Sequence, residues 1–270
     1  MNTATVQKAR PPTGTQEWAA SNVKIQDGCE HDCRYCYAKT MAIRFKRATP
    51  TSWKQPRLRQ HDLDRGFTHR SGRIMFPTAH DITDRNIDEC LTVLTRMLAA
   101  GNDVLIVSKP RLSCIKRLCE ELTPYRAQIL FRFSIGSTDD EILSFWEPNA
   151  PSFKARLACL QYAYARDFQT SVSGEPMLDG DPDALVAAVR PFVSDCIWLG
   201  RINRLRQILP FNCPRNAEAV RRGAALVALQ SDETIRALYA RYRRDSKIKW
   251  KDSIKAVVGL GRPTATGLDV

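Results

Sequence analysis

Residues Gly28–Lys39 read GCEHDCRYCYAK and bring Cys29, Cys33 and Cys36 together just after a short apolar run. A helix-like segment follows them. Three thiolates on one tight loop can ligate three irons of a 4Fe–4S cluster, which a fourth cysteine normally completes. The sequence has no fourth cysteine close by, so one iron would remain open to a substrate or cofactor. The spacing therefore predicts an iron–sulfur site with a vacant coordination position.

A zinc site is the rival interpretation, with His31 or one of the distant histidines (His61, His69 and His80) as the fourth ligand. Zinc sites usually combine two CxxC pairs, and this sequence has one such pair in the loop. The position of the loop favours the cluster, because the loop follows the first predicted strand of a repeating β/α pattern.

Short runs rich in Ile, Leu, Val and Phe alternate with helix-like segments along most of the chain. Such runs are typical of strands covered on both faces, and the alternation predicts parallel strands joined by right-handed crossovers. Six units predict an α/β fold, either a partial barrel or an open doubly wound sheet, with ligands at the carboxyl ends of the strands. The expected strands are 22–26, 73–79, 103–108, 128–135, 168–177 and 195–202, and the expected helices are 34–47, 85–100, 111–122, 152–166 and 181–193.

The residues GCEHDCRYCY resemble the CX3CX2C signature of the radical S-adenosylmethionine (SAM) superfamily, which has an aromatic residue inside the last pair. The resemblance spans roughly residues 20–205 and implies a partial (β/α)6 barrel of the radical SAM type. It also implies that Cys29, Cys33 and Cys36 ligate a 4Fe–4S cluster whose open iron binds SAM. Reductive cleavage of SAM would yield a 5′-deoxyadenosyl radical that abstracts hydrogen from a substrate. A flavodoxin or ferredoxin would supply the electron, and Tyr35 would lie beside the adenine.

Within the superfamily, the segments IVSKP, EPNAPSFKARL and SGEPML look most like the spore photoproduct lyase-like group. That likeness favours a pyrimidine or modified thymine base in DNA as the substrate, with repair, or hypermodification by rearrangement, as the outcome. Two alternatives stay open. One is a radical SAM enzyme that acts on a small molecule or a peptide, and the other is a non-enzymatic zinc or iron–sulfur module that binds nucleic acid.

Polar residues near the predicted strand ends supply candidates for binding SAM. Lys109 or Arg156 could pair with its carboxylate, Ser134 or Ser173 could bind its ribose, and Glu175 could face the ribose or a substrate amine. The glycine-glycine-glutamate contact that the family usually has after the second strand is replaced by TAHDITD. Cys213, in the loop after the sixth strand, is the candidate hydrogen donor.

The net charge of +12 and the pI of about 9.5 favour a polyanionic partner. Residues 39–73 hold ten Lys or Arg against two acids, and residues 241–255 hold seven against two. Trp53, Phe67, Tyr242 and Trp250 lie among these charges, a pattern that predicts contact with DNA.

The domain plan is an irregular lead-in (1–20), a radical SAM core (21–205) with a basic insertion (48–72), and a basic helical C-terminal extension (206–270). The sequence contains no apolar run of the ~18–20 residues that a membrane span needs. Its first residues lack the apolar core of a secretory signal. We therefore expect a cytoplasmic protein, which leaves its thiols reduced.

Overall fold

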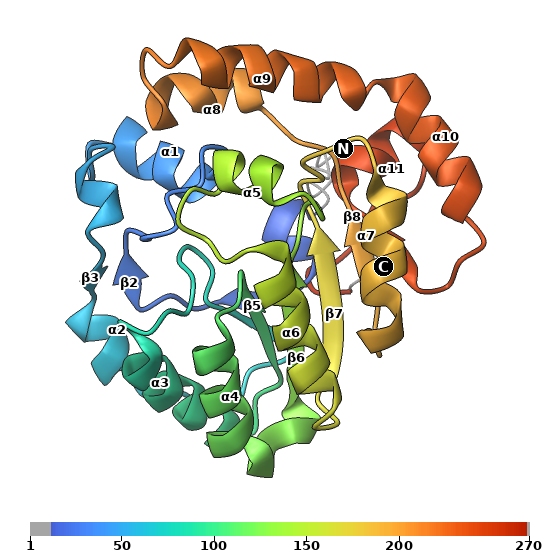
Figure 1. Cartoon of the computed structure of the whole chain (residues 1–270). Helices are drawn as coiled ribbons and strands as arrows, with labels where there is room; N and C mark the ends of the chain where they lie inside the picture. Colours follow the sequence, from blue (N-terminus) through green and yellow to red (C-terminus); the bar gives the residue numbers. More distant parts are fainter. Residues whose placement is uncertain (1–11, 269–270) are drawn as a thin grey trace, which may run out of the picture.

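Seven parallel strands form one sheet whose spatial order follows the order of the strands in the sequence (Figure 1). The computed structural model describes residues 12–268. A separate antiparallel pair, β2 (Gln26–Asp27) and β3 (Arg57–Leu58), carries the start of the cysteine loop. The sheet strands are β1 (Ser21–Asn22), β4 (Ile74–Phe76), β5 (Val104–Ser108), β6 (Ile129–Ser134), β7 (Gln169–Gly174), β8 (Ile197–Leu199) and β9 (Ile248–Trp250).

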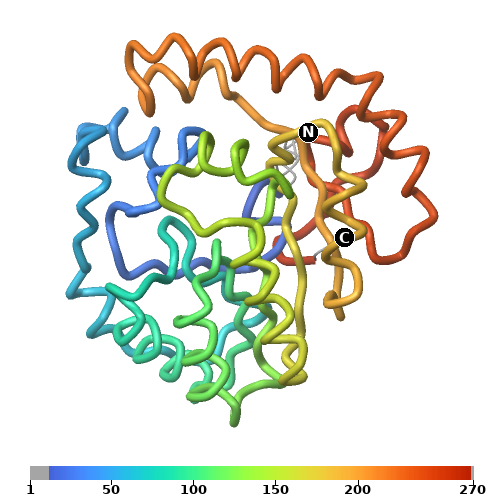
Figure 2. The backbone as a smooth tube through the Cα atoms, viewed as in Figure 1, coloured from blue at the N-terminus to red at the C-terminus, as the bar shows by residue number. Residues whose placement is uncertain are grey.

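The strand order never reverses, so every crossover advances in the same direction around the sheet. Figure 2 shows this as colours that pass from blue through green and yellow to red without doubling back across the sheet. A doubly wound sheet would reverse at a switch point, and the predicted partial barrel is therefore confirmed over the open alternative. The helices that cover its outer face include α3 (Ile87–Ala99), α4 (Leu112–Glu121), α6 (Phe153–Tyr164) and α7 (Pro182–Val189).

The other helices lie mainly at the carboxyl ends of the strands and at the C-terminal edge of the sheet (Figure 1). The strand β7 points towards the end of the molecule occupied by α1 (Tyr37–Arg44), α5 (Asp140–Trp146), α8 (Leu205–Asn212) and α9 (Ala217–Leu229). These four helices surround the place where a barrel of this kind binds its ligands. The remaining helical segments are α2 (Gln60–Asp64), α10 (Asp232–Tyr242), α11 (Asp252–Val258), η1 (Gly14–Glu17), η2 (Ser52–Lys54), η3 (Thr123–Gln128) and η4 (Arg190–Phe192).

The seventh strand comes from the C-terminal extension, where residues 225–258 had the pattern of helix. The prediction of helix is wrong at β9, whose residues Ile248 and Trp250 are buried on either side of the partly exposed Lys249. That alternation has a period of two, which suits an edge strand. It places Ile248 opposite Ile197 and Trp250 opposite Leu199 of β8.

The first strand is shorter than the predicted range 22–26. Val23 still donates its N–H to the carbonyl of Met75 at 3.0 Å, but the N–H of Ile25 donates to the imidazole of His80 at 3.2 Å. A side chain thus takes the place of a backbone partner, and the chain leaves the sheet towards the cysteine loop. The other five predicted strands are confirmed with narrower bounds.

The inner face of the sheet is filled by the end of the lead-in, residues 12–20; the first eleven residues of the lead-in lie outside the described residues. The ring of Trp18 is buried 5.8 Å from that of Trp198 on β8. Its neighbour Glu17 is fully buried and pairs with Lys251 at 2.8 Å. A buried acid needs such a partner, so the lead-in is tied to the sheet by charge as well as by packing.

The two basic windows are only partly exposed. Lys39, Lys251 and Lys255 are buried, as are Trp53 and Trp250. Both tryptophan rings belong to the packed interior, so neither offers an exposed face for the predicted contact with DNA. Within residues 12–268, no helix combines the length and the apolar character that crossing a membrane requires.

Candidate cluster and cofactor site

The cysteine loop joins β2 to α1 at the carboxyl end of the sheet. It begins at Gly28, whose φ of +89° lies in the region that favours glycine. A Cβ there would come within 2.7 Å of the carbonyl oxygen of Trp53, and the same carbonyl accepts the N–H of Cys29 at 3.0 Å. Trp53 of the basic insertion is buried, and its carbonyl therefore fixes the start of the cysteine loop.

Two of the three cysteines of the loop are buried, and the third, Cys36, is partly exposed. Cys29 and Cys33 are 7% and 6% exposed, and Cys36 caps α1 with its sulfur accepting the N–H of Lys39 at 3.4 Å. Burial, with help from the charges of Asp81 and Cys36, raises the pKa of Cys29 to about 12. Burial also raises the pKa of Cys33 and of Cys36. A bare thiolate is costly here, and a bound metal would reverse that cost.

Asp81, which follows β4, connects the loop to the sheet. Its Oδ2 lies 3.0 Å from Nδ1 of His31, a fully buried loop residue. Its Oδ1 accepts hydrogen bonds from the hydroxyl of Ser108 at 2.9 Å and from the N–H of Lys109 at 2.6 Å. Burial alone would raise the pKa of Asp81, but the charge of Lys109 and the contact with His31 hold it well below its usual range. The other ring nitrogen of His31, Nε2, is buried without a partner among the described residues.

Lys109 follows β5 in the phase of its inward-facing residues Leu105 and Val107. Its ammonium lies 3.9 Å from Asp81, 4.0 Å from Glu147 and 5.9 Å from the ring centre of Tyr35. Burial would lower the pKa of Lys109, but these acidic neighbours and Cys33 raise it well above its usual value. A permanent positive charge therefore stands beside the thiols.

Glu147, at the end of α5, binds two of the predicted site residues. One of its oxygens accepts the hydroxyl of Tyr35, and the other pairs with the guanidinium of Arg156. Arg156 also donates to the carbonyl oxygens of Ser134 at 3.0 Å and Pro151 at 2.8 Å. The sequence did not single out Glu147, because nothing in a loop glutamate signals a partner as distant along the chain as Tyr35.

Ser134 and Ser173 lie side by side at the ends of β6 and β7, where they are register partners. The hydroxyl of Ser173 is buried and has no hydrogen-bond partner among the described residues. An unpaired buried hydroxyl is rare, and it commonly marks a place where a ligand or water completes the bond. Ser173 therefore offers an unused donor at the mouth of the barrel.

Two of the predicted site residues, Glu175 and Cys213, lie apart from the contacts around Asp81 and Glu147. The side chain of Glu175 packs against Gly200, where a Cβ would come within 2.5 Å of it, and burial raises its pKa. Cys213 lies 4.0 Å from the guanidinium of Arg34 and lines a cavity of about 210 Å³ between the cysteine loop and the insertion. The residues that line this cavity include none from the strand ends, and the role of Cys213 as hydrogen donor stays a prediction.

The structure thus brings Cys29, Cys33, Cys36, Tyr35, Lys109 and Arg156 into one connected network, with Ser134 joined to it through the backbone bond from Arg156. Their predicted roles towards SAM remain predictions. The sequence predicted neither the His31–Asp81 contact nor the Tyr35–Glu147 hydrogen bond. They depend on pairs of residues at least fifty positions apart.

One further set of ligands bears on the zinc alternative. Cys29, His31 and Asp81 each offer an atom within 4.8 Å of the others, whereas the three cysteines do not form so tight a group among the described residues. Sulfur ligands of one zinc ion at ~2.3 Å would lie closer together than that. Both oxygens of Asp81 are already engaged, and a zinc ion there would stand near the ammonium of Lys109. The arrangement favours the cluster.

Comparison with known proteins gives limited sequence likeness. No family model matches this chain. An uncharacterised protein, ORF301, of Acidianus two-tailed virus is 26% identical over 148 residues, which are 50% of this chain and 48% of the viral protein.

Solved structures give a clearer likeness in fold. Spore photoproduct lyase complexed with dinucleoside spore photoproduct is 15% identical with a TM-score of 0.53, over 78% of this chain and 66% of that chain. SuiB of Streptococcus suis, bound to S-adenosylmethionine, is 12% identical with a TM-score of 0.52, over 92% of this chain and 54% of that chain. The chain thus spans about half to two thirds of the length of these proteins. These likenesses confirm the predicted fold, the partial barrel that this chain shares with spore photoproduct lyase and SuiB.

The Asp81 contacts can be tested by the substitution Asp81→Asn. We expect it to lower the free energy of unfolding by about 3–5 kcal/mol, because it leaves the buried ammonium of Lys109 without one of its two carboxylate neighbours. It should also lower the iron content of reconstituted protein. The exposed Asp84, which accepts hydrogen bonds from Ser113 and Cys114 of α4, supplies the control Asp84→Asn. Urea titration and iron analysis measure both effects, and equal unfolding midpoints for the two variants would contradict the assignment.

Proposed function

We propose that this protein is a radical SAM enzyme whose cluster is held by Cys29, Cys33 and Cys36 and whose substrate is a pyrimidine base in DNA. The observation that carries the proposal is the buried loop of three thiols beside a lysine at the carboxyl end of a partial barrel. Three thiolates around a dicationic iron–sulfur core leave a net negative charge. The ammonium of Lys109 is suited to offset that charge, and the surrounding charge and hydrogen bonds set the potential of such a cluster.

The chain fits the cofactors that this function needs. When bound, the cluster and SAM together would supply an electron and a sulfonium that splits into methionine and a 5′-deoxyadenosyl radical. The unpaired hydroxyl of Ser173 and its neighbour Ser134 are positioned to bind a ribose. Tyr35 is fixed by its bond to Glu147 next to the third cysteine, a suitable place for a base.

Lys109 is the better of the two cations predicted for the SAM carboxylate. Each of the three nitrogens of the Arg156 guanidinium already donates a hydrogen bond, to Pro151, Ser134 and Glu147. The ammonium of Lys109 has no partner closer than 3.9 Å among the carboxylates of the described residues. We therefore assign Arg156 to holding Glu147 and Tyr35 in place, and Lys109 to the anionic end of SAM. Glu175 remains the proposed contact for the ribose or a substrate amine.

The chemistry can be tested with Cys33→Ala. Anaerobically reconstituted protein with this change should bind less iron, lose its visible absorbance, and form neither methionine nor 5′-deoxyadenosine after reduction. The matched control is Cys119→Ala, which alters a cysteine buried in the core at α4. It should keep both the iron and the cleavage. An unaltered protein that holds iron but never cleaves SAM would refute the proposal, and one that holds zinc instead would favour the non-enzymatic alternative.

The substrate can be tested by adding DNA to the unaltered protein. The dinucleoside lesion bound to spore photoproduct lyase and the net charge of +12 both support DNA. We expect deoxyadenosine formation to rise several-fold with DNA that carries the right pyrimidine, and mass analysis of the nucleosides should show the product. A rate that stays at the DNA-free level with every DNA tested would favour a small molecule or a peptide.

The ribose contact can be tested with Ser173→Ala. We expect the dissociation constant for SAM to rise about five- to tenfold while the free energy of unfolding stays the same or increases, since the lost hydroxyl has no partner in the protein. The control is Ser171→Ala on the same face of β7. Its hydroxyl binds the carbonyl of Cys196 at 2.6 Å and the guanidinium of Arg132 at 3.0 Å.

The control should reverse the pattern, with lower stability by about 1–3 kcal/mol and unchanged affinity for SAM. Calorimetric titration of SAM and urea unfolding measure the two quantities. Equal SAM affinities for Ser173→Ala and the unaltered protein would remove Ser173 from the site.

A further inference from the structure

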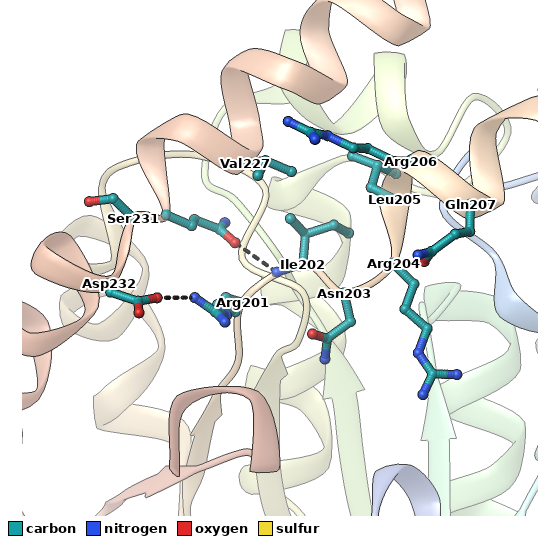
Figure 3. Close-up of a pocket in the computed structure, with 11 residues that line it drawn as sticks. Arg201, Ile202, Asn203, Arg204, Leu205, Arg206, Gln207, Val227, Ser231 and Asp232 are labelled. Carbon is teal, nitrogen blue, oxygen red and sulfur yellow. Dashed lines mark hydrogen bonds and ion pairs between the residues drawn. The ribbon is translucent and has the colours of Figure 1, made fainter. Parts of the chain in front are cut away.

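A separate pocket of about 390 Å³ opens beyond the end of β8, between the segment that leads into α8 and the junction of α9 with α10 (Figure 3). Its volume lies at the lower end of the ~300–1,000 Å³ range of small-ligand sites. It has room for a single nucleotide unit but not for a folded partner. None of the cysteine ligands lines it, and so it is distinct from the cluster site.

Three arginines line this pocket, and two of them are uncommitted. Arg201 pairs with Asp232 at 2.7 Å, and Asp232 is the one carboxylate among the described residues that line the pocket. Arg204 and Arg206 are exposed and form no ion pair within residues 12–268. In Figure 3 the side chains of Arg204 and Asn203 extend to the side where the strands of the sheet end, whereas the side chain of Arg206 extends the opposite way, towards the helix that carries Val227. The pocket therefore presents free guanidinium groups, which suit a phosphate.

The wall that carries these arginines is held in a fixed position. Gln230, buried at the end of α9, accepts the N–H of Ile202 at 2.7 Å and donates to the carbonyl of Met177 at 2.7 Å. Arg204 has a φ of +54°, an unfavourable value for a residue with a side chain. It makes no side-chain hydrogen bond to the first turn of α8. The two hydrogen bonds of Gln230 therefore hold this wall of the pocket in place.

The pocket adjoins the mouth of the barrel. Ile202 and Leu205 of its wall belong to the same apolar cluster as Trp146, and Tyr35 packs against that cluster. Met177, tied to Gln230, follows β7 and its unpaired Ser173. A nucleic-acid strand with one phosphate in the pocket would hold an adjacent nucleotide close to the strand ends.

We propose that this pocket binds the backbone of a single DNA strand, with Arg204 on the phosphate beside the nucleotide whose base enters the barrel and Arg206, on the opposite side of the pocket, on a neighbouring phosphate. The inference rests on the proposed function, since it takes the DNA substrate as given. Beyond that function, it specifies where on the protein the backbone of the DNA strand binds. An enzyme that acts on a base outside the stack needs its flanking phosphates fixed, because an extruded nucleotide has lost its neighbours' support.

The test uses a fluorescent single-stranded oligodeoxynucleotide of about 12 nucleotides. Its binding to reconstituted, unreduced protein is measured over a range of salt concentrations. We expect R204Q/R206Q to weaken binding about tenfold at low salt and to reduce the slope of log affinity against log salt by about 0.7 for each lost phosphate contact. The matched control is R126Q/R166Q. It removes the same charge from exposed residues that precede β6 and β7, at the opposite end of the strands.

The control should bind as the unaltered protein does, and D232N should bind about two- to fivefold more tightly because it removes the pocket's carboxylate and frees Arg201. The variants R204K/R206K keep the charge and should give intermediate affinity. Equal losses in R204Q/R206Q and R126Q/R166Q would overturn the pocket as a specific site. Competition by thymidine monophosphate as strong as that by the oligonucleotide would overturn the strand in favour of a free nucleotide.

The proposed function fails by a different readout. Unaltered protein that binds the oligonucleotide through this pocket but does not cleave SAM would refute the radical chemistry and leave the pocket standing. If the unaltered protein cleaves SAM while R204Q/R206Q binds DNA normally, the radical chemistry stands and the pocket is refuted as the DNA site.

Discussion

The carboxylate of Asp81 is the contact on which the candidate site depends. One oxygen meets the buried ring of His31 from the cysteine loop, and the other binds Ser108 and the backbone of Lys109 at the end of β5. The loop, two strand ends and a buried cation are joined through a single side chain. An acid buried this deeply stays charged only because these donors surround it. Burial lowers the pKa of Lys109, but Cys33, Tyr35, Asp81 and Glu147 together raise it.

The winding of the sheet explains why these groups can meet at all. Seven parallel strands in sequence order bring every carboxyl end to the same edge. Residues from β4, β5, β6 and β7 therefore face one another there, although they are spread over more than ninety positions. The helices α1, α5, α8 and α9 close around that edge (Figure 1). The opposite part of the interior is filled by Trp18, Trp198 and Arg132, so the free space lies at the carboxyl end.

Charge in this molecule is arranged in two ways. Some basic residues of the windows noticed in the sequence are interior: Lys39 pairs with Asp32, and Lys251 pairs with Glu17. These pairs fasten α1 and the lead-in, and they contribute nothing to binding a polyanion. By contrast, Arg204 and Arg206 beyond β8 are exposed at a pocket and remain available to a polyanion. Net charge alone does not distinguish these cases, because it ignores which cations are already neutralised.

The sequence by itself determined the cysteine loop, the alternation of strands and helices, and the strand ends at which Lys109, Ser134 and Ser173 lie. These features are local: the spacing of the thiols, the short apolar runs and the phase of each strand are fixed by neighbouring residues. Only the tertiary structure decided that Glu147 binds Tyr35, that β9 joins the sheet, and that Trp53 is buried rather than exposed. Each of these depends on which distant residue a side chain meets, and burial sets the cost of leaving a polar group unpaired only once the fold has formed.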